Sequence, residues 1–254
     1  MIIRSATNPK YKYIKKLSKK KYRKKYKAFV IESKKIVEEV TNPAITENAI
    51  VDFVFVNEDM KDFKTSHEKI VFSNDLFEKI SLMKNPEGLS AVVKMPKAQK
   101  IKADRILLLD HIQDPGNLGT IIRSAEAFAF TDIILYNDCV DLYNEKTLRA
   151  SMGSIFRLNF TNLNKDQIFS LKKDYKIIGA DMGGSDIREF KKSQKIILCI
   201  GNEANGLSAY IREIADSFVA IPMKGKIESL NAAIAASILM NNLSLWSEGT
   251  LVFL

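Results

Sequence analysis

Residues 107–127 read LLLDHIQDPGNLGTIIRSAEA, and this stretch decides how the second half of the chain is built. It begins as an apolar strand, turns through the polar residues 110–117 and then enters a helix that carries Arg123. Two later stretches repeat the pattern of an apolar strand followed by a polar loop, at residues 200–208 and 221–231. We expect the three loops to meet in one site.

Short apolar runs recur through the second half and are typical of parallel strands covered on both faces. They lie at residues 105–110, 132–136, 176–180, 195–200 and 217–221. Helical patterns separate them, at residues 118–128, 144–151, 165–173 and 208–215, and the longest predicted helix covers residues 229–246. The fold class predicted for residues 105–254 is therefore α/β with a mostly parallel sheet. Ligands collect at the carboxyl ends of such strands, where all three loops lie.

The first part of the chain predicts a smaller α/β domain, and 254 residues leave room for two modest domains. Strands are expected at residues 28–32, 51–56, 69–72 and 88–95, with helices at 33–40 and 73–83. Pro96 begins a polar, lysine-containing stretch. We predict an N-terminal domain at residues 1–96, a linker at 97–104 and the larger domain at 105–254.

The net charge of +9 is concentrated in one segment. Residues 1–27 hold 12 of the 39 basic side chains and no acidic one, which leaves 27 basic against 30 acidic residues in the rest of the chain. Such a concentration predicts binding to a phosphate backbone.

A basic helix is expected from Asn8, as its cap, and Pro9, with apolar and aromatic residues at helical spacing. Ammonium groups can pair with phosphates and tyrosine rings can stack on unpaired bases, so we predict that this helix contacts RNA. The RNA-binding candidates are Lys12, Lys16, Lys20, Arg23 and Lys24. The alternative is that the lysines only form a solvated face and the tyrosines pack on the core. A helix lying on a membrane surface is a minor alternative, because the apolar stripe is thin.

Composition argues against several classes of protein. Two cysteines and two histidines favour neither a disulfide framework nor a metal site, so no metal is expected. Neither GxGxxG after the first strand nor GxxxxGK[ST] occurs. There is no N-terminal signal core and no run near the roughly 18 apolar residues of a membrane span. We expect a cytoplasmic protein with no membrane partner.

The first loop offers a helix start that favours an anionic or polar ligand. Asn117 is its expected cap, and Arg123 follows within about two turns. Arg123 could hold a phosphate or polarise a hydroxyl, although a helix cap or a surface ion pair is the plainer alternative. In the second loop, Gly201 permits close backbone approach to a ligand, and Glu203 could pair with Arg123 or sit in an ordinary turn.

The third loop suits a purine ring, with apolar walls at Ile221 and Met223 beside free backbone groups. Ser229 opens the last predicted helix and could be only its cap. Asn231 offers both a donor and an acceptor. Small residues follow at 232–236, where another helix, for example from a second subunit, could approach closely.

Three stretches, DPGNLGTIIRSAEAF, IGNEANGLS and IPMKGKIESLNAAIAASI, together resemble the signature motifs of the SpoU/TrmH family of RNA ribose 2′-O-methyltransferases, in the SPOUT superfamily. The resemblance extends to residues 149–154 and, upstream, to FVIE at 29–32 and NPEG at 85–88, which resemble the family's N-terminal substrate-binding domain. It covers nearly the whole chain.

The resemblance implies methyl transfer from S-adenosylmethionine to a ribose 2′-hydroxyl, a trefoil knot near the C-terminus, and a homodimer built around that region. Cofactor-contacting positions fall on Gly201, Ile221 and Leu230, to which we add Met223 and Asn231. Functional positions fall on Asn117, Arg123, Glu203, Ser229 and Asn231, with Arg123 the main catalytic candidate, acting across the dimer. Many members read Asn-Val-Ser where this chain has Asn231, Ala232 and Ala233, so one hydroxyl is missing.

A guanidinium is a poor base in water, so we favour Arg123 holding a phosphate and polarising the hydroxyl, with water or a transiently neutral Arg taking the proton. The expected substrate is 23S ribosomal RNA, and transfer RNA is the alternative. Three rivals stay open: a non-catalytic RNA-binding protein, an enzyme that methylates a base nitrogen, and a methyltransferase that confers antibiotic resistance by modifying the ribosome.

Overall fold

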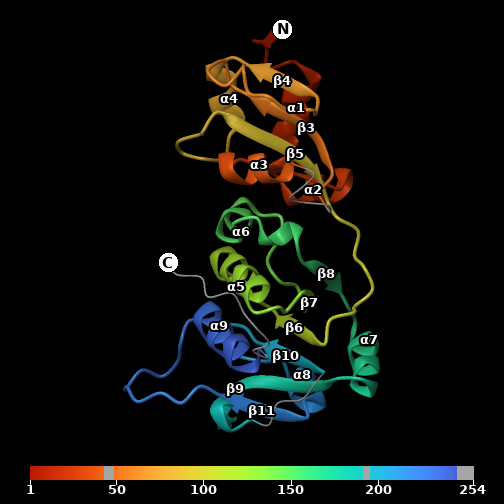
Figure 1. Cartoon of the computed structure of the whole chain (residues 1–254), viewed down its shortest axis with the longest axis vertical. Helices are drawn as coiled ribbons and strands as arrows, with labels where there is room; N and C mark the ends of the chain where they lie inside the picture. The colour runs from red at the N-terminus through yellow and green to blue at the C-terminus, as the bar shows by residue number, and fades with distance from the viewer. Residues whose placement is uncertain (43–48, 191–194, 245–254) are drawn as a thin grey trace. The chain divides into compact units, whose positions relative to one another are not determined.

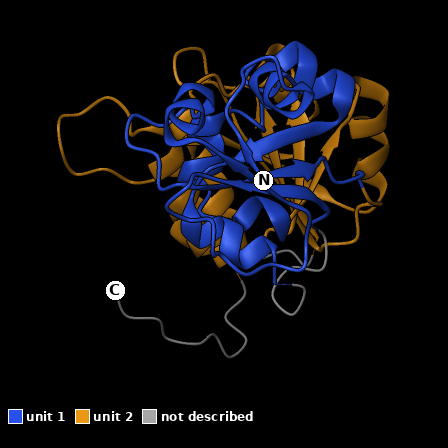
Figure 2. Cartoon of the chain, turned by 90° about the horizontal axis from the view of Figure 1, so that it is seen from above, with its two compact units in different colours: residues 1–98, 141–157 blue, residues 99–140, 158–254 orange. Residues whose placement is uncertain are grey.

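The computed structural model describes residues 1–42, 49–190 and 195–244. The chain forms two compact units, drawn in different colours in Figure 2. Unit 1 comprises residues 1–98 and 141–157, and unit 2 comprises residues 99–140 and 158–254. The chain therefore passes between the units three times. Each unit is built around a sheet of its own.

The sheet of unit 1 is mixed and has the strand order β1-β4-β3-β5-β2. Figure 1 labels its three middle strands, β4, β3 and β5. Its strands are β1 (Ile2–Ile3), β2 (Ala28–Ile31), β3 (Val51–Val56), β4 (Lys69–Phe72) and β5 (Leu89–Lys94). β4 pairs in parallel with β1 and β3, whereas β5 is antiparallel to both β2 and β3. The apolar runs predicted all but the two-residue strand β1, which is too short to carry a pattern.

Helices cover both faces of this sheet. On one face, apolar side chains of α1 (Pro9–Leu17) and α4 (Asn74–Ile80) pack with Phe53, Phe55 and Phe72 in one core cluster. α3 (Lys34–Val40) contacts β5, and α6 (Glu145–Ala150) contacts β2. Phe29 of β2 stacks on Tyr143 and Phe156, at ring-centroid distances of 4.5 and 6.1 Å.

Residues 141–157 belong to unit 1, although they lie inside the predicted domain 105–254. Besides α6 they carry the short helix η1 (Ser154–Phe156). An ion pair joins Glu39 of α3 to Arg157, and the carboxylate of Glu39 lies against Gly153, which has a positive φ of 87°. A compact unit therefore draws on a segment far from it in sequence, which no local pattern could indicate.

The basic segment forms two helices where we predicted one. Asn8 caps α1 as expected, and its side chain accepts a hydrogen bond from Lys10 N at 2.9 Å. The chain then turns at Ser18 and Lys19 before α2 (Lys20–Tyr26) begins. The apolar side of α1 is buried in the core, which leaves Lys12, Lys15 and Lys16 exposed and Lys10 half-buried.

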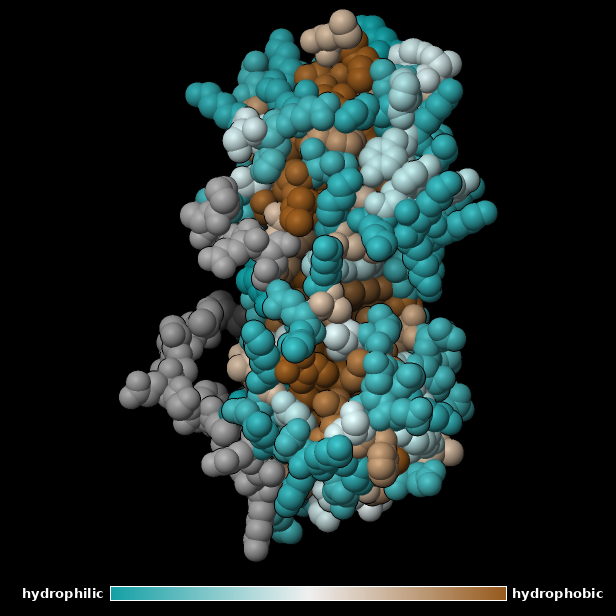
Figure 3. Space-filling view, turned by 90° about the vertical axis from the view of Figure 1, so that its right-hand side faces the viewer, coloured by the Kyte–Doolittle hydropathy of each residue, from teal (hydrophilic) through white to brown (hydrophobic). Residues whose placement is uncertain are grey.

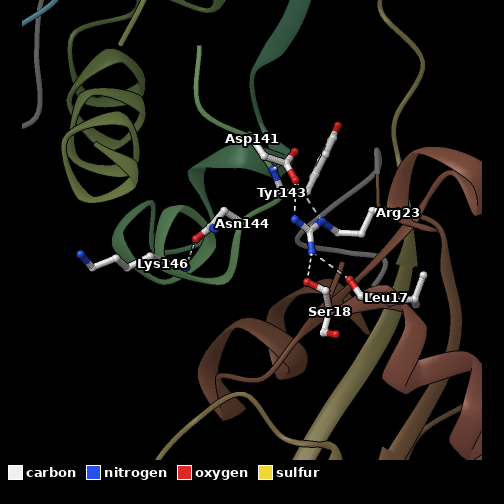
Figure 4. Close-up of polar contacts among 7 residues, drawn as sticks. All are labelled: Leu17, Ser18, Arg23, Asp141, Tyr143, Asn144 and Lys146. Atoms are coloured by element: carbon white, nitrogen blue, oxygen red, sulfur yellow. Dashed lines mark hydrogen bonds and ion pairs between the residues drawn. The ribbon is translucent and has the colours of Figure 1, made fainter. Parts of the chain in front are cut away.

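Arg23 departs from the prediction that it contacts RNA. Its side chain is buried, and its guanidinium donates to the carbonyl oxygens of Leu17 and Ser18 at 2.9 and 2.7 Å. It also forms an ion pair with Asp141, to which its Nε donates at 3.1 Å (Figure 4). These bonds satisfy carbonyls left open where α1 ends. A guanidinium so engaged does not face solvent, so we remove Arg23 from the expected RNA surface.

The sheet of unit 2 has the strand order β11-β9-β10-β6-β7-β8, and every neighbouring pair is parallel. Its strands are β6 (Arg105–Asp110), β7 (Asp132–Tyr136), β8 (Asn159–Asn162), β9 (Lys176–Asp186), β10 (Ile196–Ile200) and β11 (Ser217–Ala220). The predicted α/β class is confirmed. The edge strand β8 was missed because its sequence, NFTN, is mostly polar. The trefoil knot stays a prediction.

Helices also lie on both faces of this sheet. α7 (Lys165–Ser170) and α8 (Ala209–Ile214) share a core cluster with Ile106 and Leu108 of β6. Successive side chains of a strand point to opposite faces, so Leu107 and Leu109 face the other side. There α5 (Pro115–Ala127) and α9 (Ala232–Leu243) pack side by side (Figure 1). The short helices η2 (Leu171–Lys173) and η3 (Ile187–Glu189) complete the unit. The predicted end of the last helix, Trp246, lies outside the described residues.

Candidate functional site

Three loops of unit 2 follow the carboxyl ends of β6, β10 and β11, as the sequence predicted. β6 and β10 are neighbours in the sheet, and their loops lead into α5 and α8. The loop after β11 leads into α9, which packs against α5. The starts of α5 and α9 are thereby brought close to the loop at residues 201–208.

The first turn of α5 frees Asn117 for a role outside its own helix. Asp114, and not Asn117 as predicted, is the cap: its Oδ1 accepts a hydrogen bond from Asn117 N at 2.7 Å. Pro115 fits the first helical position because it has no N–H to satisfy. The half-buried side chain of Asn117 can then bond to other loops.

A chain of hydrogen bonds joins the three loops through Asn117. Asn231 Nδ2 donates to Asn117 Oδ1 at 2.9 Å, and Asn117 Nδ2 donates to Glu203 Oε1 at 2.9 Å. Both ends of the Asn117 amide are engaged, which fixes its orientation. Glu203 therefore bonds to Asn117 and not to Arg123, which the sequence offered as its partner. Three predicted site residues from three loops are in direct contact.

Asn231 has a second task at the start of α9. Its Oδ1 accepts hydrogen bonds from Ala233 N at 2.9 Å and Ile234 N at 3.4 Å, so it caps the helix. The helix was predicted to begin at Ser229, three residues too early. Because the cap uses the oxygen of Asn231, its amide nitrogen remains to donate to Asn117.

Asn202 supports the second loop and was missed as a site residue. Its Nδ2 donates to His111 O at 3.0 Å and lies 3.4 Å from Glu203 Oε2. Its Oδ1 accepts from the backbone N–H groups of Ala204 and Asn205. The side chain thus shapes its own loop and ties it to the loop after β6. Its position beside Glu203 was the available signal.

Asp110 is a second residue that sequence reasoning missed. It ends β6, it is 1% exposed, and its Oδ2 accepts a hydrogen bond from Ser208 N at 2.7 Å. Its Oδ1 accepts from Asn137 Nδ2 at 3.3 Å. A buried carboxylate requires such partners, so an acid at the end of an apolar strand could have been read as a loop anchor.

Arg123 and Ser229 lie apart from this hydrogen-bonded chain. Arg123 is exposed on α5, and within the described residues its side chain has no hydrogen bond or ion pair. Six residues beyond Asn117, it points about 120° away around the helix axis. Ser229 is exposed in the third loop. Ala233, the position at which a hydroxyl is missing, is buried and only 2% exposed.

Among the described residues, the third loop leaves its backbone groups free, as the predicted purine site requires. Residues 223–229 are exposed, and residues 223–230 make no hydrogen bond with another described residue. Their backbone donors and acceptors are available to a purine edge, beside the apolar side chains of Ile221, Met223 and Leu230. Gly201 is also required by its own loop, because a Cβ there would overlap the backbone of Gly206 and Leu207.

Fold and loops together define an α/β protein with one polar site at the carboxyl edge of a parallel sheet. Across residues 1–42, 49–190 and 195–244, no group of three or more His, Cys, Asp or Glu side chains could hold a metal ion. In the same residues, none of the helices has both the length and the apolar character needed to cross a membrane.

Residues 104–241 match the SpoU rRNA Methylase family, and residues 8–91 match the MRM3-like substrate binding domain. The chain belongs to the SpoU rRNA Methylase family. This membership confirms the resemblance drawn from the three motifs, and with it the expectation of an S-adenosylmethionine-dependent RNA methyltransferase.

Two relatives extend the comparison. The 23S rRNA (guanosine(2553)-2′-O)-methyltransferase RlmP of Bacillus subtilis (strain 168) is 35% identical over 247 residues, which covers 95% of this chain and 98% of RlmP. The 23S rRNA (uridine(2479)-2′-O)-methyltransferase of Streptomyces viridochromogenes is 32% identical over 188 residues, which covers 68% of this chain and 66% of that protein.

Solved structures agree in fold across both units. The SpoU methyltransferase AviRb from Streptomyces viridochromogenes, in complex with AdoMet, has a TM-score of 0.82 at 26% identity and covers 93% of this chain and 97% of that one. An AdoMet-bound rRNA methyltransferase from Sinorhizobium meliloti has a TM-score of 0.83 at 26% identity, covering 96% and 97%.

Proposed function

We propose that this chain transfers a methyl group from S-adenosylmethionine to the 2′-hydroxyl of one ribose in 23S ribosomal RNA. The hydrogen-bonded chain of Asn231, Asn117 and Glu203 carries the proposal, because it unites residues from all three family motifs. The names of the two 23S rRNA relatives support the choice of RNA. Transfer RNA is the alternative substrate. A ribosomal substrate implies action in the cytoplasm.

We assign the residues of the three loops either to the cofactor or to the ribose, according to where they lie. S-adenosylmethionine, when bound, supplies an electrophilic methyl group on its sulfonium. Ile221, Met223 and Leu230 would provide apolar contacts for the cofactor, and Gly201 and Asn231 would hold it through their backbone groups. Asn117 and Asn231 hold the loops in register, and the second hydrogen of each amide nitrogen, together with the exposed carboxylate of Glu203, remains for the ribose. Ser229, on the exposed third loop, offers a hydroxyl to the substrate.

Arg123 is assigned to the substrate side of the reaction. A guanidinium remains protonated in proteins and is a poor base, so its task is to hold the neighbouring phosphate and polarise the attacking hydroxyl. Its exposed side chain leaves all five donors available. Replacing Arg123 by Lys keeps the charge and removes the fork, and we expect methyl transfer to fall about tenfold. Near-full activity of Arg123→Lys would exclude a bidentate role.

A homodimer brings Arg123 to a site, because in one chain Arg123 faces away from Asn117. The surface formed by α5 and α9 supports such an interface. Its exposed residues are Thr120, Arg123 and Ala127 on α5 and Ile234, which is 53% exposed, on α9. Ser124 and Ser237 bond at 2.7 Å between these two helices. In the proposed dimer, Arg123 serves the cofactor site of the partner, and the knot near the C-terminus contributes to the same region.

Four exposed lysines form the proposed RNA-binding surface of unit 1: Lys12, Lys16, Lys20 and Lys24. Neither α1 nor α2 has an acidic residue in its first turn, and the sequence has none before residue 32. Each lysine that meets a phosphate releases a counterion, so binding falls as salt rises. Arg23 has no part in this surface.

The test is a map of ribose methylation across total RNA from cells with and without this gene, read by alkaline fragmentation at single-nucleotide resolution. We expect one protected position in 23S rRNA to disappear and to return with the wild-type gene but not with Arg123→Ala. If the methylated position that disappears lies in a transfer RNA, 23S rRNA is the wrong substrate and ribose methylation stands. If no ribose position changes, ribose methylation is wrong, and a base-nitrogen target or a non-catalytic role replaces it.

A further inference from the structure

Three half-buried tyrosines gather on the basic helices of unit 1: Tyr13 of α1 and Tyr22 and Tyr26 of α2. Tyr22 and Tyr26 are one turn apart and so share a helix face. Their rings are nearly parallel, at 14° and a centroid distance of 6.2 Å. Tyr13 meets Tyr26 edge-on at 5.2 Å. Tyr11 is 4% exposed and lies within the core cluster, and Tyr13 and Tyr26 pack against that cluster with part of their rings still exposed.

Lysine side chains flank these rings. Lys16 Nζ lies 5.9 Å from the centre of the Tyr22 ring, and Lys25 Nζ lies 5.7 Å from that of Tyr26. Asp52, whose charge acts on Tyr13, is itself ion-paired with Lys94 at 2.8 Å. The environment of Tyr22 and Tyr26 is therefore aromatic and strongly positive. Figure 3 looks onto the side where α2 lies in Figure 1, and hydrophilic side chains project there beside paler residues.

The position of α2 is fixed from its opposite side. Arg23 follows Tyr22 directly and points inward, where it binds the carbonyls that end α1 and the carboxylate of Asp141 (Figure 4). The corner between α1 and α2 is therefore held in place before any ligand arrives. A surface ordered in advance loses less entropy on binding.

We propose that Tyr22 and Tyr26 form a stacking subsite for an unpaired base of the RNA, with Lys16 and Lys25 against its flanking phosphates. This inference rests on the proposed function for its RNA ligand and adds the kind of RNA that unit 1 recognises. Aromatic rings stack on bases that are splayed out of a helix, whereas bases in a duplex are covered by their neighbours. A lipid surface fits poorly, because the apolar side of α1 is already buried in the core.

The test compares single-stranded and duplex RNA. A single-stranded oligonucleotide containing 2-aminopurine reports stacking through quenched fluorescence, and its fully paired duplex serves as the second ligand. Tyr22→Leu and Tyr26→Leu remove the rings without changing charge, and Tyr22→Phe and Tyr26→Phe keep the rings. We expect each Leu variant to bind the single strand about tenfold more weakly with reduced quenching, the Phe variants to bind like wild type, and duplex binding to stay unchanged.

Two results would overturn the subsite. One is wild-type affinity of the Leu variants for the single strand. The other is an equal loss for single strand and duplex, which would mean that the rings only support the fold. Thermal unfolding of each variant identifies a folding defect directly. A separate assay of methyl transfer by the wild-type protein tests the proposed function, so failure of the chemistry and failure of the subsite are distinguishable.

Discussion

Asn231 Nδ2 donates a hydrogen bond to Asn117 Oδ1 at 2.9 Å, although the two residues are 114 positions apart. The bond joins the first turn of α5 to the cap of α9, and Asn117 passes the connection on to Glu203. The arrangement needs a side chain at residue 117 with both a donor and an acceptor, which asparagine supplies.

Asn117→Ala removes both bonds, and Asn117→Asp replaces the donor by a carboxylate facing Glu203. We expect methyl transfer to fall about 100-fold in Asn117→Ala, because the loops lose their register, and further in Asn117→Asp, because like charges repel. Incorporation of labelled methyl groups into rRNA measures the effect. Asn205→Ala, in an exposed turn of the second loop, is the matched control and should retain its activity. An active Asn117→Ala would refute the role of the hydrogen-bonded chain.

Whether Arg123 acts on the cofactor site of the partner subunit can be tested by co-expressing two inactive variants. Co-expression of Arg123→Ala with Asn231→Ala produces half heterodimers, each with one intact site if Arg123 serves the partner's cofactor loop. Methyl transfer by the unfractionated mixture of dimers should recover to about a quarter of the wild-type rate, and by heterodimers isolated through two different tags to about half of it. If Arg123 served its own chain, no heterodimer would contain an intact site, and the mixture would remain as inactive as its components.

Breaking the ion pair between Arg23 and Asp141 should destabilise unit 1, because the two side chains are only 8% and 14% exposed. Removing one partner leaves the charge of the other buried and unpaired. Arg23→Met or Asp141→Leu should therefore each lower the free energy of unfolding by about 3–5 kcal/mol. The double variant should regain much of that loss. Urea unfolding monitored by circular dichroism gives the values.

The matched control for that measurement is the exposed pair Lys10–Glu68, with side chains 41% and 57% exposed. Lys10→Met should change the free energy of unfolding by less than about 1 kcal/mol. Equal effects of Lys10→Met and Arg23→Met would show that burial of the Arg23 pair contributes nothing.

Glu32 gives a pH-dependent stability of unit 1. Burial raises the pKa of its carboxyl above the usual 4.5, although hydrogen bonds from Leu82 N and Ser81 Oγ, at 3.1 Å, partly oppose this. A raised pKa means that folding favours the protonated form. The stability that Glu32 contributes is therefore full below its unfolded pKa and is lost as pH rises through its folded pKa.

Glu32→Gln imitates the protonated form at every pH. The melting temperature of the variant minus that of the wild type should therefore increase as pH rises from 4.5 to 8. Differential scanning calorimetry in matched buffers measures this difference. A difference that stays constant, or that shrinks with rising pH, would contradict the assigned effect of burial.

Several elements could be predicted because their physics is local. β6, β7, β3 and β4 begin and end where predicted, since each is an apolar run bounded by polar or turn residues. Asn8 and Pro9 marked the start of α1 for the same reason. β8 was missed because an edge strand is held by backbone hydrogen bonds to β7 and does not need apolar side chains.

Sequence alone determined the apolar strands, the three loops at the carboxyl edge and, through the order of the motifs, the family. Only the tertiary structure decided which polar groups meet. It turned Arg23 inward to Asp141, made Asn231 a cap that also bonds to Asn117, and drew residues 141–157 into unit 1. Periodicity reports the face on which a side chain lies. The partner it finds there depends on contacts between residues 86 to 118 positions apart, where desolvation and hydrogen-bond satisfaction decide the outcome.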